Sequence, residues 1–482
     1  MSFNSLAFVG FLLVAFGLYW ALPHRFRWGV LLVASYLFYA SWSPTFIFLL
    51  LATTALSYAL ALLLGRCVDT RQKKQLLVLA LIACSGGLFA FKYLSWLARG
   101  AVTLLGTFAL PLQPVTLKLL VPIGISFYTL RTLGYLVDVY RGTSPAEKHF
   151  GHYAVFISFF PSIISGPIER ACTLLPQIKK EHSFDYASAT YGLKLIAWGF
   201  FKKLAIADVI AQLINPIFAD VYSHSGFVLV LSAVLFAVQI YGDFSGYTDI
   251  ALGVARLFGI NLTQNFKSPY FSRSLKEFWR RWHISLSTWL RDYIYIPLGG
   301  NRQGKAKTAL NLLITFLVSG LWHGANLTFL AWGFFHGAGA IIEGLFTRKN
   351  KPGETRHRLL RSVIPVLLTF TFCCFAWIFF RVNTLSEAGY FISHLFTGVR
   401  APIHYLHTGL FAMGFTRVSL MELVLACFLL IVFDAVSLKA DVFKRLGSLP
   451  RLIRWPFYVS FVLLLVALMP VAVNPNFIYF RF

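Results

Sequence analysis

His323 is the residue of this sequence best suited to proton-transfer chemistry. It lies in Trp322-His323-Gly324, directly after the apolar run Leu310–Leu321. It follows the basic residue Lys307 by about 16 residues, or ~24 Å of helix, and a bilayer core is ~30 Å thick. If this run crosses a membrane, the imidazole lies inside it, where an ionisable group is costly and is expected to have a function. Imidazole suits general acid–base work near neutral pH, but a structural hydrogen bond to a neighbouring helix would explain His323 equally well.

His283 lies in a segment with a basic face and an aromatic face. The spacing predicts one amphipathic helix over Glu277–Tyr293. Its basic or polar face holds Lys276, Arg280, His283, Ser287 and Arg291. Its opposite face holds Phe278, Trp282, Leu286 and Trp289. This helix would anchor at the membrane interface with a solvated histidine, or would line an entry whose cations attract an anionic donor such as the phosphates of coenzyme A or of carrier-bound pantetheine.

A third group of polar residues lies inside an apolar segment. Asp243, Ser245 and Asp249 fall within Phe227–Phe258. Carboxylates buried there need partners, so we expect them to orient a histidine or to pair with an arginine. A structural pairing is at least as good an explanation as a direct chemical role.

The composition indicates the elements that must position these residues. The 482 residues are 58% hydrophobic and only 13% charged, whereas soluble domains carry about 25% charged residues. A polytopic helical membrane protein fits, and a cytosolic enzyme or secreted disulfide scaffold does not. The net charge of +25 comes mostly from short loops between apolar runs, which indicates cytoplasmic loops rather than nucleic-acid binding. The six cysteines form no C-x-x-C pair, and we expect no metal site.

The apolar runs predict about eleven transmembrane helices, with the N-terminus outside, plus re-entrant pieces such as Val155–Ile164. The runs are Leu6–Leu22, Val30–Trp42, Phe46–Leu64, Leu76–Leu97, Leu119–Val139, Tyr191–Phe218, Phe227–Phe258, Leu310–Leu321, Leu327–Phe346, Val363–Phe380, Leu420–Val436 and Pro456–Val473.

Several long motifs, in order along the chain, resemble the membrane-bound O-acyltransferases, and more narrowly their bacterial alginate O-acetylation branch. The motifs are Pro122–Phe127, Val137–Gly142, Asp243–Asp249, Phe278–Tyr293, Leu298–Arg302, Gly320–Asn326 and Trp377–Arg381. The resemblance covers about residues 8–383, and residues 384–482 are less diagnostic. We therefore expect residues 1–482 to form a single integral membrane domain.

The resemblance implies a ring of tilted helices around a central tunnel in a bacterial plasma membrane. The family's catalytic histidine falls on His323, and the histidine of its Arg-Arg-Trp-His motif falls on His283. Further residues that would line the donor tunnel are Arg280, Arg281, Trp282, Ser287, Arg291, Trp322, Asn326, Asp243, Ser245 and Asp249.

The resemblance also implies substrates and partners. The donor would be acetyl-CoA or another acyl thioester used as substrate, with no permanently bound cofactor. Relatives pass the acyl group to a periplasmic or extracellular partner of the SGNH type, which esterifies a polysaccharide acceptor. An acyl carrier protein would be the partner in the nearest alternative, D-alanyl transfer to teichoic acid. A transporter of small anions or lipid-linked sugars, and a non-catalytic scaffold, remain as other classes.

Overall fold

The computed structural model describes residues 1–482 except 2, 4, 107–120, 347–359 and 469–482. Every regular element within the described residues is a helix, which confirms the all-helical class. The start of the expected run Leu119–Val139 and the end of Pro456–Val473 lie outside the described residues. The chain divides into two compact units, residues 1–196 with 250–263, and residues 197–249 with 264–482.

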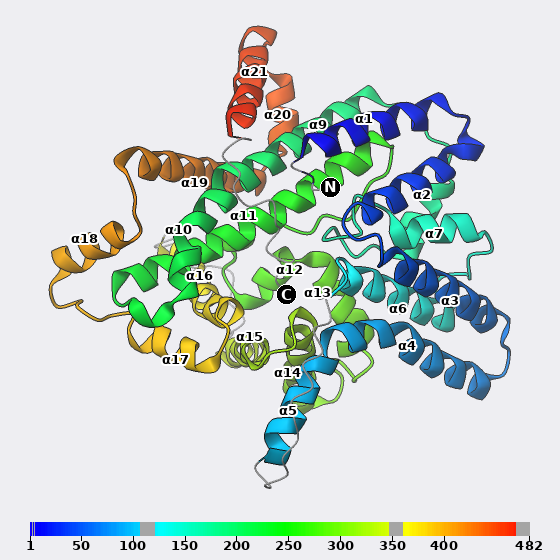
Figure 1. The fold of residues 1–482 in the computed structure, drawn as a ribbon, viewed down its shortest axis with the longest axis horizontal. Coiled ribbons are helices and arrows are strands. Elements are labelled where there is room, and N and C mark those ends of the chain that lie inside the picture. Colours follow the sequence, from blue (N-terminus) through cyan, green and yellow to red (C-terminus); the bar gives the residue numbers. More distant parts are fainter. Residues whose placement is uncertain (2, 4, 107–120, 347–359, 469–482) are drawn as a thin grey trace, which may run out of the picture. The chain divides into compact units, whose positions relative to one another are not determined.

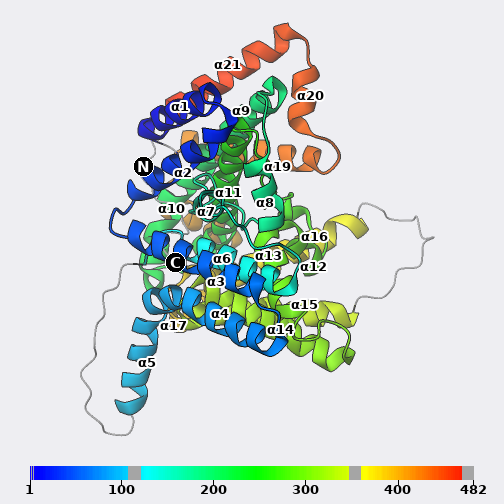
Figure 2. The same cartoon turned by 90° about the vertical axis from the view of Figure 1, so that its right-hand side faces the viewer.

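The first unit is built mainly from the N-terminal helices, among which α3, α4 and α6 lie side by side (Figures 1 and 2). The helices are α1 (Leu6–Ala21), α2 (His24–Ala40), α3 (Ile47–Arg66), α4 (Thr70–Lys92), α5 (Leu94–Gly106), α6 (Ile125–Arg141), α7 (Phe150–Ser158), α8 (Ala171–Lys179) and most of α9 (Tyr186–Phe201). The expected run Leu76–Leu97 is interrupted at Tyr93, where α4 ends and α5 begins.

The second unit contains the three sequence regions singled out above. Its helices are a π-helix (Lys202–Ala207), α10 (Asp208–Ala219), most of α11 (Phe227–Leu257), α12 (Leu275–Arg281), α13 (Ile284–Leu290), a second π-helix (Arg291–Tyr295), α14 (Gly304–His323), α15 (Leu327–Phe346), α16 (Leu360–Arg381), α17 (Leu385–Ser393), α18 (Pro402–Ala412), α19 (Arg417–Ser437), α20 (Val442–Ser448) and α21 (Arg451–Leu468). Short 3₁₀ turns occupy Val221–Ser223 and Pro269–Phe271.

Seven of the described helices are long and apolar enough to cross a membrane, which confirms a multi-pass protein. They are α3, α4, α11, α15, α16, α19 and α21. Other expected spans are helical but shorter or more polar: α1 has 16 residues, and α14 begins with Lys305 and Lys307. The expected figure of about eleven therefore exceeds the number that length and apolar composition support among the described residues.

The expected re-entrant segment begins inside a short helix whose C-terminal end contacts a buried arginine of α6. Helix α7 has nine residues, which is ~14 Å and too short to cross a bilayer. The Arg131 guanidinium from α6 donates to the carbonyl oxygens of Phe156 and Ile157, at 2.8 and 3.1 Å, and to Ser162 Oγ at 2.9 Å. These carbonyls have no partner within their own helix, so the arginine stabilises the end of α7 and the turn after it.

Two glycines allow α14 and α15 to approach closely as a helical hairpin (Figure 1). A Cβ at Gly320 would lie 2.2 Å from the Phe329 carbonyl oxygen, and one at Gly333 would lie 2.4 Å from the Phe316 carbonyl oxygen. Real side chains do not fit at those distances, and small residues are the usual means of close helix packing in membranes. The close hairpin fixes the position of the C-terminal end of α14.

Candidate functional site

His323 is the last residue of α14, so the expected helix end at Trp322-His323-Gly324 is confirmed. Lys307 and His323 lie on this one unbroken helix, which supports the ~24 Å separation expected between them. The imidazole is 4% exposed and contacts the rings of Trp332 in α15 and Phe380 in α16, at centroid distances of 5.0 and 5.1 Å. Aromatic rings from two neighbouring helices therefore hold the orientation of His323.

The segment around His283 differs from the prediction of one amphipathic helix over Glu277–Tyr293, which was wrong. Helix α12 ends at Arg281, α13 begins at Ile284, and His283 between them has a left-handed backbone with φ of 43°. Spacings of four and three residues describe a shared face only on a continuous helix, so the predicted basic face does not form. His283 is 1% exposed rather than solvated.

Asn265 stabilises this break in the helix. Its carbonyl oxygen accepts the Ile284 N–H at 3.0 Å, and its Oδ1 accepts the Ser285 N–H at 3.1 Å. The first N–H groups of a helix need acceptors, and here a fully buried asparagine supplies two of them in place of a side-chain cap from His283. The chain can therefore turn at His283 while the backbone N–H groups of Ile284 and Ser285 keep acceptors.

Trp322 places both histidines in one cluster. Its ring centroid lies 6.0 Å from that of His283 and 4.8 Å from that of His323. His283 also packs edge-on against Phe244 of α11 at 4.7 Å. Burial lowers the pKa of the His283 imidazole, so this ring is neutral at neutral pH. At His283 the site thus offers a neutral imidazole in an aromatic setting, which suits a proton acceptor better than a cationic docking group.

The other predicted tunnel residues are engaged locally. Arg280 is exposed, Arg281 pairs with Glu277, and Arg291 pairs with Asp292. Trp282 is buried with its ring centroid 5.1 Å from that of Trp377, and the Ser287 hydroxyl donates to the Trp282 carbonyl oxygen at 3.2 Å. Asn326 donates to the Asn383 carbonyl oxygen at 2.7 Å. The arginines therefore form no common basic surface with His283.

The carboxylates of α11 pair with lysines that we did not anticipate. Lys203 Nζ lies 2.7 Å from Asp243 Oδ1 and 2.8 Å from Asp208 Oδ1. Lys202 Nζ lies 2.7 Å from Asp249 Oδ2 and donates to Ser245 Oγ at 2.9 Å. Both lysines begin the π-helix that follows α9. These ion pairs explain how charges persist in apolar helices, and they favour a structural role for Asp243 and Asp249.

Glycines of α11 bring this lysine-bearing segment close. A Cβ at Gly246 would lie 2.8 Å from the Gly199 carbonyl oxygen, and one at Gly242 would lie 3.2 Å from the Lys202 carbonyl oxygen. The signal for the missed lysines was visible in the sequence: two adjacent lysines inside an apolar run require buried carboxylates.

His336 of α15 lies in the same aromatic region. It is fully buried, and its Nδ1 accepts the Trp279 indole N–H at 3.3 Å. Trp332 contacts the rings of both His336 and His323, at 4.9 and 5.0 Å. Trp332 and Phe380 are site residues that the sequence did not single out, because a tryptophan or phenylalanine in an apolar helix is more often part of the packing.

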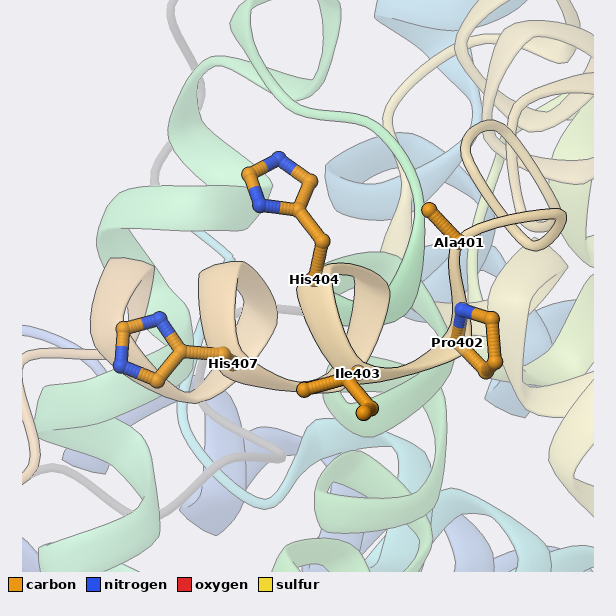
Figure 3. A pocket seen from close by; sticks show the side chains of 5 residues that line it. All are labelled: Ala401, Pro402, Ile403, His404 and His407. Atoms are coloured by element: carbon orange, nitrogen blue, oxygen red, sulfur yellow. The ribbon is translucent and has the colours of Figure 1, made fainter.

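No group of three or more His, Cys, Asp or Glu side chains in the described part of the chain could hold a metal ion. All six cysteines are free. A recess on α18 is lined by Ala401, Pro402, Ile403, His404 and His407, but its two histidines point in different directions (Figure 3). This recess offers no converging ligands.

Comparison with known proteins places this arrangement in a family. A family model described as membrane-bound O-acyltransferase matches residues 147–386, which include both histidines of the cluster. A probable alginate O-acetylase of Pseudomonas syringae pv. tomato is 40% identical over 82% of this chain and 75% of its own length. A peptidoglycan O-acetyltransferase of Helicobacter pylori is 33% identical over 74% of this chain and 71% of its own. A teichoic acid D-alanyltransferase of Streptococcus thermophilus is 32% identical over 49% of this chain and 60% of its own length.

Proposed function

Because this chain belongs to the membrane-bound O-acyltransferase family and is an acyltransferase, we propose that it transfers acetyl groups across the plasma membrane of a bacterium. The acetyl group comes from a cytoplasmic thioester and is used to O-acetylate an extracellular or periplasmic polysaccharide. The observation that carries this proposal is His323, a buried imidazole that ends a 20-residue helix beginning at a basic loop. Alginate and peptidoglycan, the polymers in the names of two relatives, suggest the class of acceptor.

His323 acts on the acceptor hydroxyl in this proposal. As general base it takes the hydroxyl proton while the oxygen attacks the thioester carbonyl, and the proton then passes to the departing thiolate. Alternatively its nitrogen attacks the thioester carbonyl, the C–S bond breaks and the thiolate leaves; the hydroxyl then attacks the acetyl group on the ring, its proton passes to the thiolate, and the neutral imidazole is regenerated. Both routes need a neutral ring in a fixed orientation, which the rings of Trp332 and Phe380 support.

His283 and Trp322 form the donor side of the proposed site. The buried imidazole of His283 contacts Trp322, which in turn contacts His323, so a substrate that reached one ring would lie near the other. The donor is acetyl-CoA, and an SGNH-type partner outside the membrane then passes the acetyl group from the hydroxyl that accepts it at His323 to the polysaccharide. The exposed Arg280 suits a donor that carries phosphates, whereas Arg281 is already paired with Glu277.

The experiment compares purified full-length wild type with His323→Ala and His323→Gln, using radiolabelled acetyl-CoA. His404→Ala, at an exposed position on α18, is the matched control. We expect label transfer or thioester cleavage to fall by about 10²–10⁴-fold in both His323 variants and to stay unchanged in the control. Full polymer acetylation in cells carrying a folded His323→Ala variant would refute the role of His323.

A second donor class is tested in the same assay because one relative is named a D-alanyltransferase. The arm uses a D-alanyl thioester of an acyl carrier protein in place of acetyl-CoA. Turnover with the carrier thioester but none with acetyl-CoA would overturn the proposed donor while leaving the acyltransferase chemistry at His323 in place.

A further inference from the structure

The first unit contains a polar cleft of about 280 Å³ that the proposed acyl transfer does not use. We call it the interfacial cleft; six of its lining residues are Trp20, Lys180, His182, Asp185, Ser188 and Arg256. They come from the C-terminal end of α1, the loop between α8 and α9 with the start of α9, and the C-terminal end of α11. Ligand sites have volumes of ~300 Å³ or more, so a cleft of about this size has room for a small headgroup.

All three segments belong to the side of the membrane that the charge distribution assigns to the cytoplasm. Arg25 and Arg27 follow α1, Lys179 and Lys180 end α8 and begin its loop, and Lys267 follows α11. The indole of Trp20 packs against the exposed ring of Phe184 at a centroid distance of 5.5 Å. Tryptophan beside basic residues is typical of the headgroup level of a bilayer.

The walls of the interfacial cleft are fixed by the protein itself. The Gln177 side chain forms two hydrogen bonds to the Asn261 backbone, at 2.8 and 3.0 Å. The Trp20 indole N–H donates to the Leu257 carbonyl oxygen at 3.0 Å. Gly259 has φ of +77°, and a Cβ there would lie 3.0 Å from the His182 ring. The cleft is therefore shaped before any ligand enters.

Its cations are available to a ligand. The Arg256 guanidinium lies over the Tyr191 ring at 4.3 Å, and within the described residues neither Arg256 nor Lys180 forms a side-chain ion pair. The one lining carboxylate of the six, Asp185, accepts the Ala187 N–H at 2.9 Å and so is already used at the start of α9. Two available cations against one engaged carboxylate favour an anion.

We propose that the interfacial cleft binds the phosphate headgroup of an anionic phospholipid from the cytoplasmic leaflet. Basic pockets between transmembrane helices on that side suit such headgroups. A lipid also uses what a soluble phosphate cannot: Phe184 is exposed at the rim, and Leu13 and Leu18 are exposed along α1, where acyl chains can lie. These exposed apolar side chains favour a lipid headgroup over a free phosphate as the ligand.

The test measures lipid binding by native mass spectrometry of the full-length protein, delipidated in detergent and titrated with phosphatidylglycerol. The variant is Lys180→Gln/Arg256→Gln. Arg71→Gln/Lys74→Gln is the matched control, because it removes the same charge from exposed positions of α4 on the same predicted side. We expect about 30-fold weaker binding in the first variant, or about 2 kcal/mol, and no change in the control.

Two further arms keep the proposal falsifiable. Phosphatidylcholine should bind more weakly than phosphatidylglycerol, and glycerol phosphate without acyl chains should bind more weakly still; equal binding of glycerol phosphate would overturn the lipid assignment. If the double variant fails to fold, Lys180→Glu alone reverses one exposed charge and should also weaken the binding of phosphatidylglycerol. Unchanged binding in a folded Lys180→Gln/Arg256→Gln protein would overturn the site itself.

Discussion

Replacing Lys203 by methionine should strongly destabilise the protein, because it leaves two carboxylates buried without their cation. The side chains of Lys203 and Asp243 are 11% and 3% exposed, and the contacts to Asp243 and Asp208 are 2.7 and 2.8 Å. At an effective dielectric constant of 20, each contact is worth about 6 kcal/mol of Coulomb energy before desolvation. Most of this is offset by the cost of burying the charges, and breaking such a pair costs about 3–5 kcal/mol. We therefore expect Lys203→Met to lower the free energy of unfolding by about 3 kcal/mol.

The assay is unfolding of the purified protein in mixed micelles, followed by far-ultraviolet circular dichroism. Lys444→Met, at an exposed position of α20, controls for the loss of a lysine. Asp243→Asn in the Lys203→Met background should restore more than ~1 kcal/mol, because it removes one of the uncompensated charges. A Lys203→Met protein within ~1 kcal/mol of wild type, or the absence of coupling in the double variant, would refute the ion-pair reasoning.

Three further perturbations test other parts of the structure. Gly246→Ala places a methyl group 2.8 Å from the Gly199 carbonyl oxygen and should cost about 1–3 kcal/mol in the same unfolding assay, whereas Gly10→Ala, with open space around it, should not destabilise. Asn265→Ala removes the acceptor of the Ser285 N–H and should cost about 1–3 kcal/mol in the same unfolding assay and reduce acetyl-CoA turnover; unchanged values of both would count against its role in the turn. Burial raises the pKa of Glu147, but its ion pair with Lys179 and the His149 N–H lower it more, so the net pKa is below the ordinary value. The Glu147 carboxylate therefore stabilises the fold at pH values above its ordinary pKa, and this stabilisation is lost as the pH falls through the lowered pKa. Glu147→Gln should flatten the acid side of a plot of melting temperature against pH. An unchanged slope would count against a stabilising role of this ion pair.

Some helix ends were predictable because apolar runs and polar links alternate along the chain. The end of α14 at His323 follows from an apolar run that stops at a histidine and a glycine. The length of Val155–Ile164 correctly indicates a segment too short to cross a bilayer, but helix α7 covers Phe150–Ser158 and shares only the first four residues of that run. Both inferences rest on length and hydrophobicity, which are local properties of a sequence.

The break at His283 was not predictable in the same way. Residues spaced by four and three fit a continuous helix, and the turn depends on Asn265, which is distant in sequence from the helix it caps. The aromatic surroundings of His323 likewise come from α15 and α16, and only the fold brings Trp332 and Phe380 to the imidazole. Contacts between separate helices decide the geometry of the site, and no local pattern encodes them.

The left-handed backbone at His283 changes how substitutions there should be interpreted. Histidine already carries a Cβ in a conformation that disfavours most L-residues, so an alanine variant would lose the imidazole and keep the backbone strain of the order of 1 kcal/mol that the wild type bears. Glycine removes the same ring but adopts this conformation without a steric penalty. The alanine variant therefore reports the contribution of the ring, and the difference between the glycine and alanine variants reports the contribution of the turn, which an alanine scan alone would not reveal.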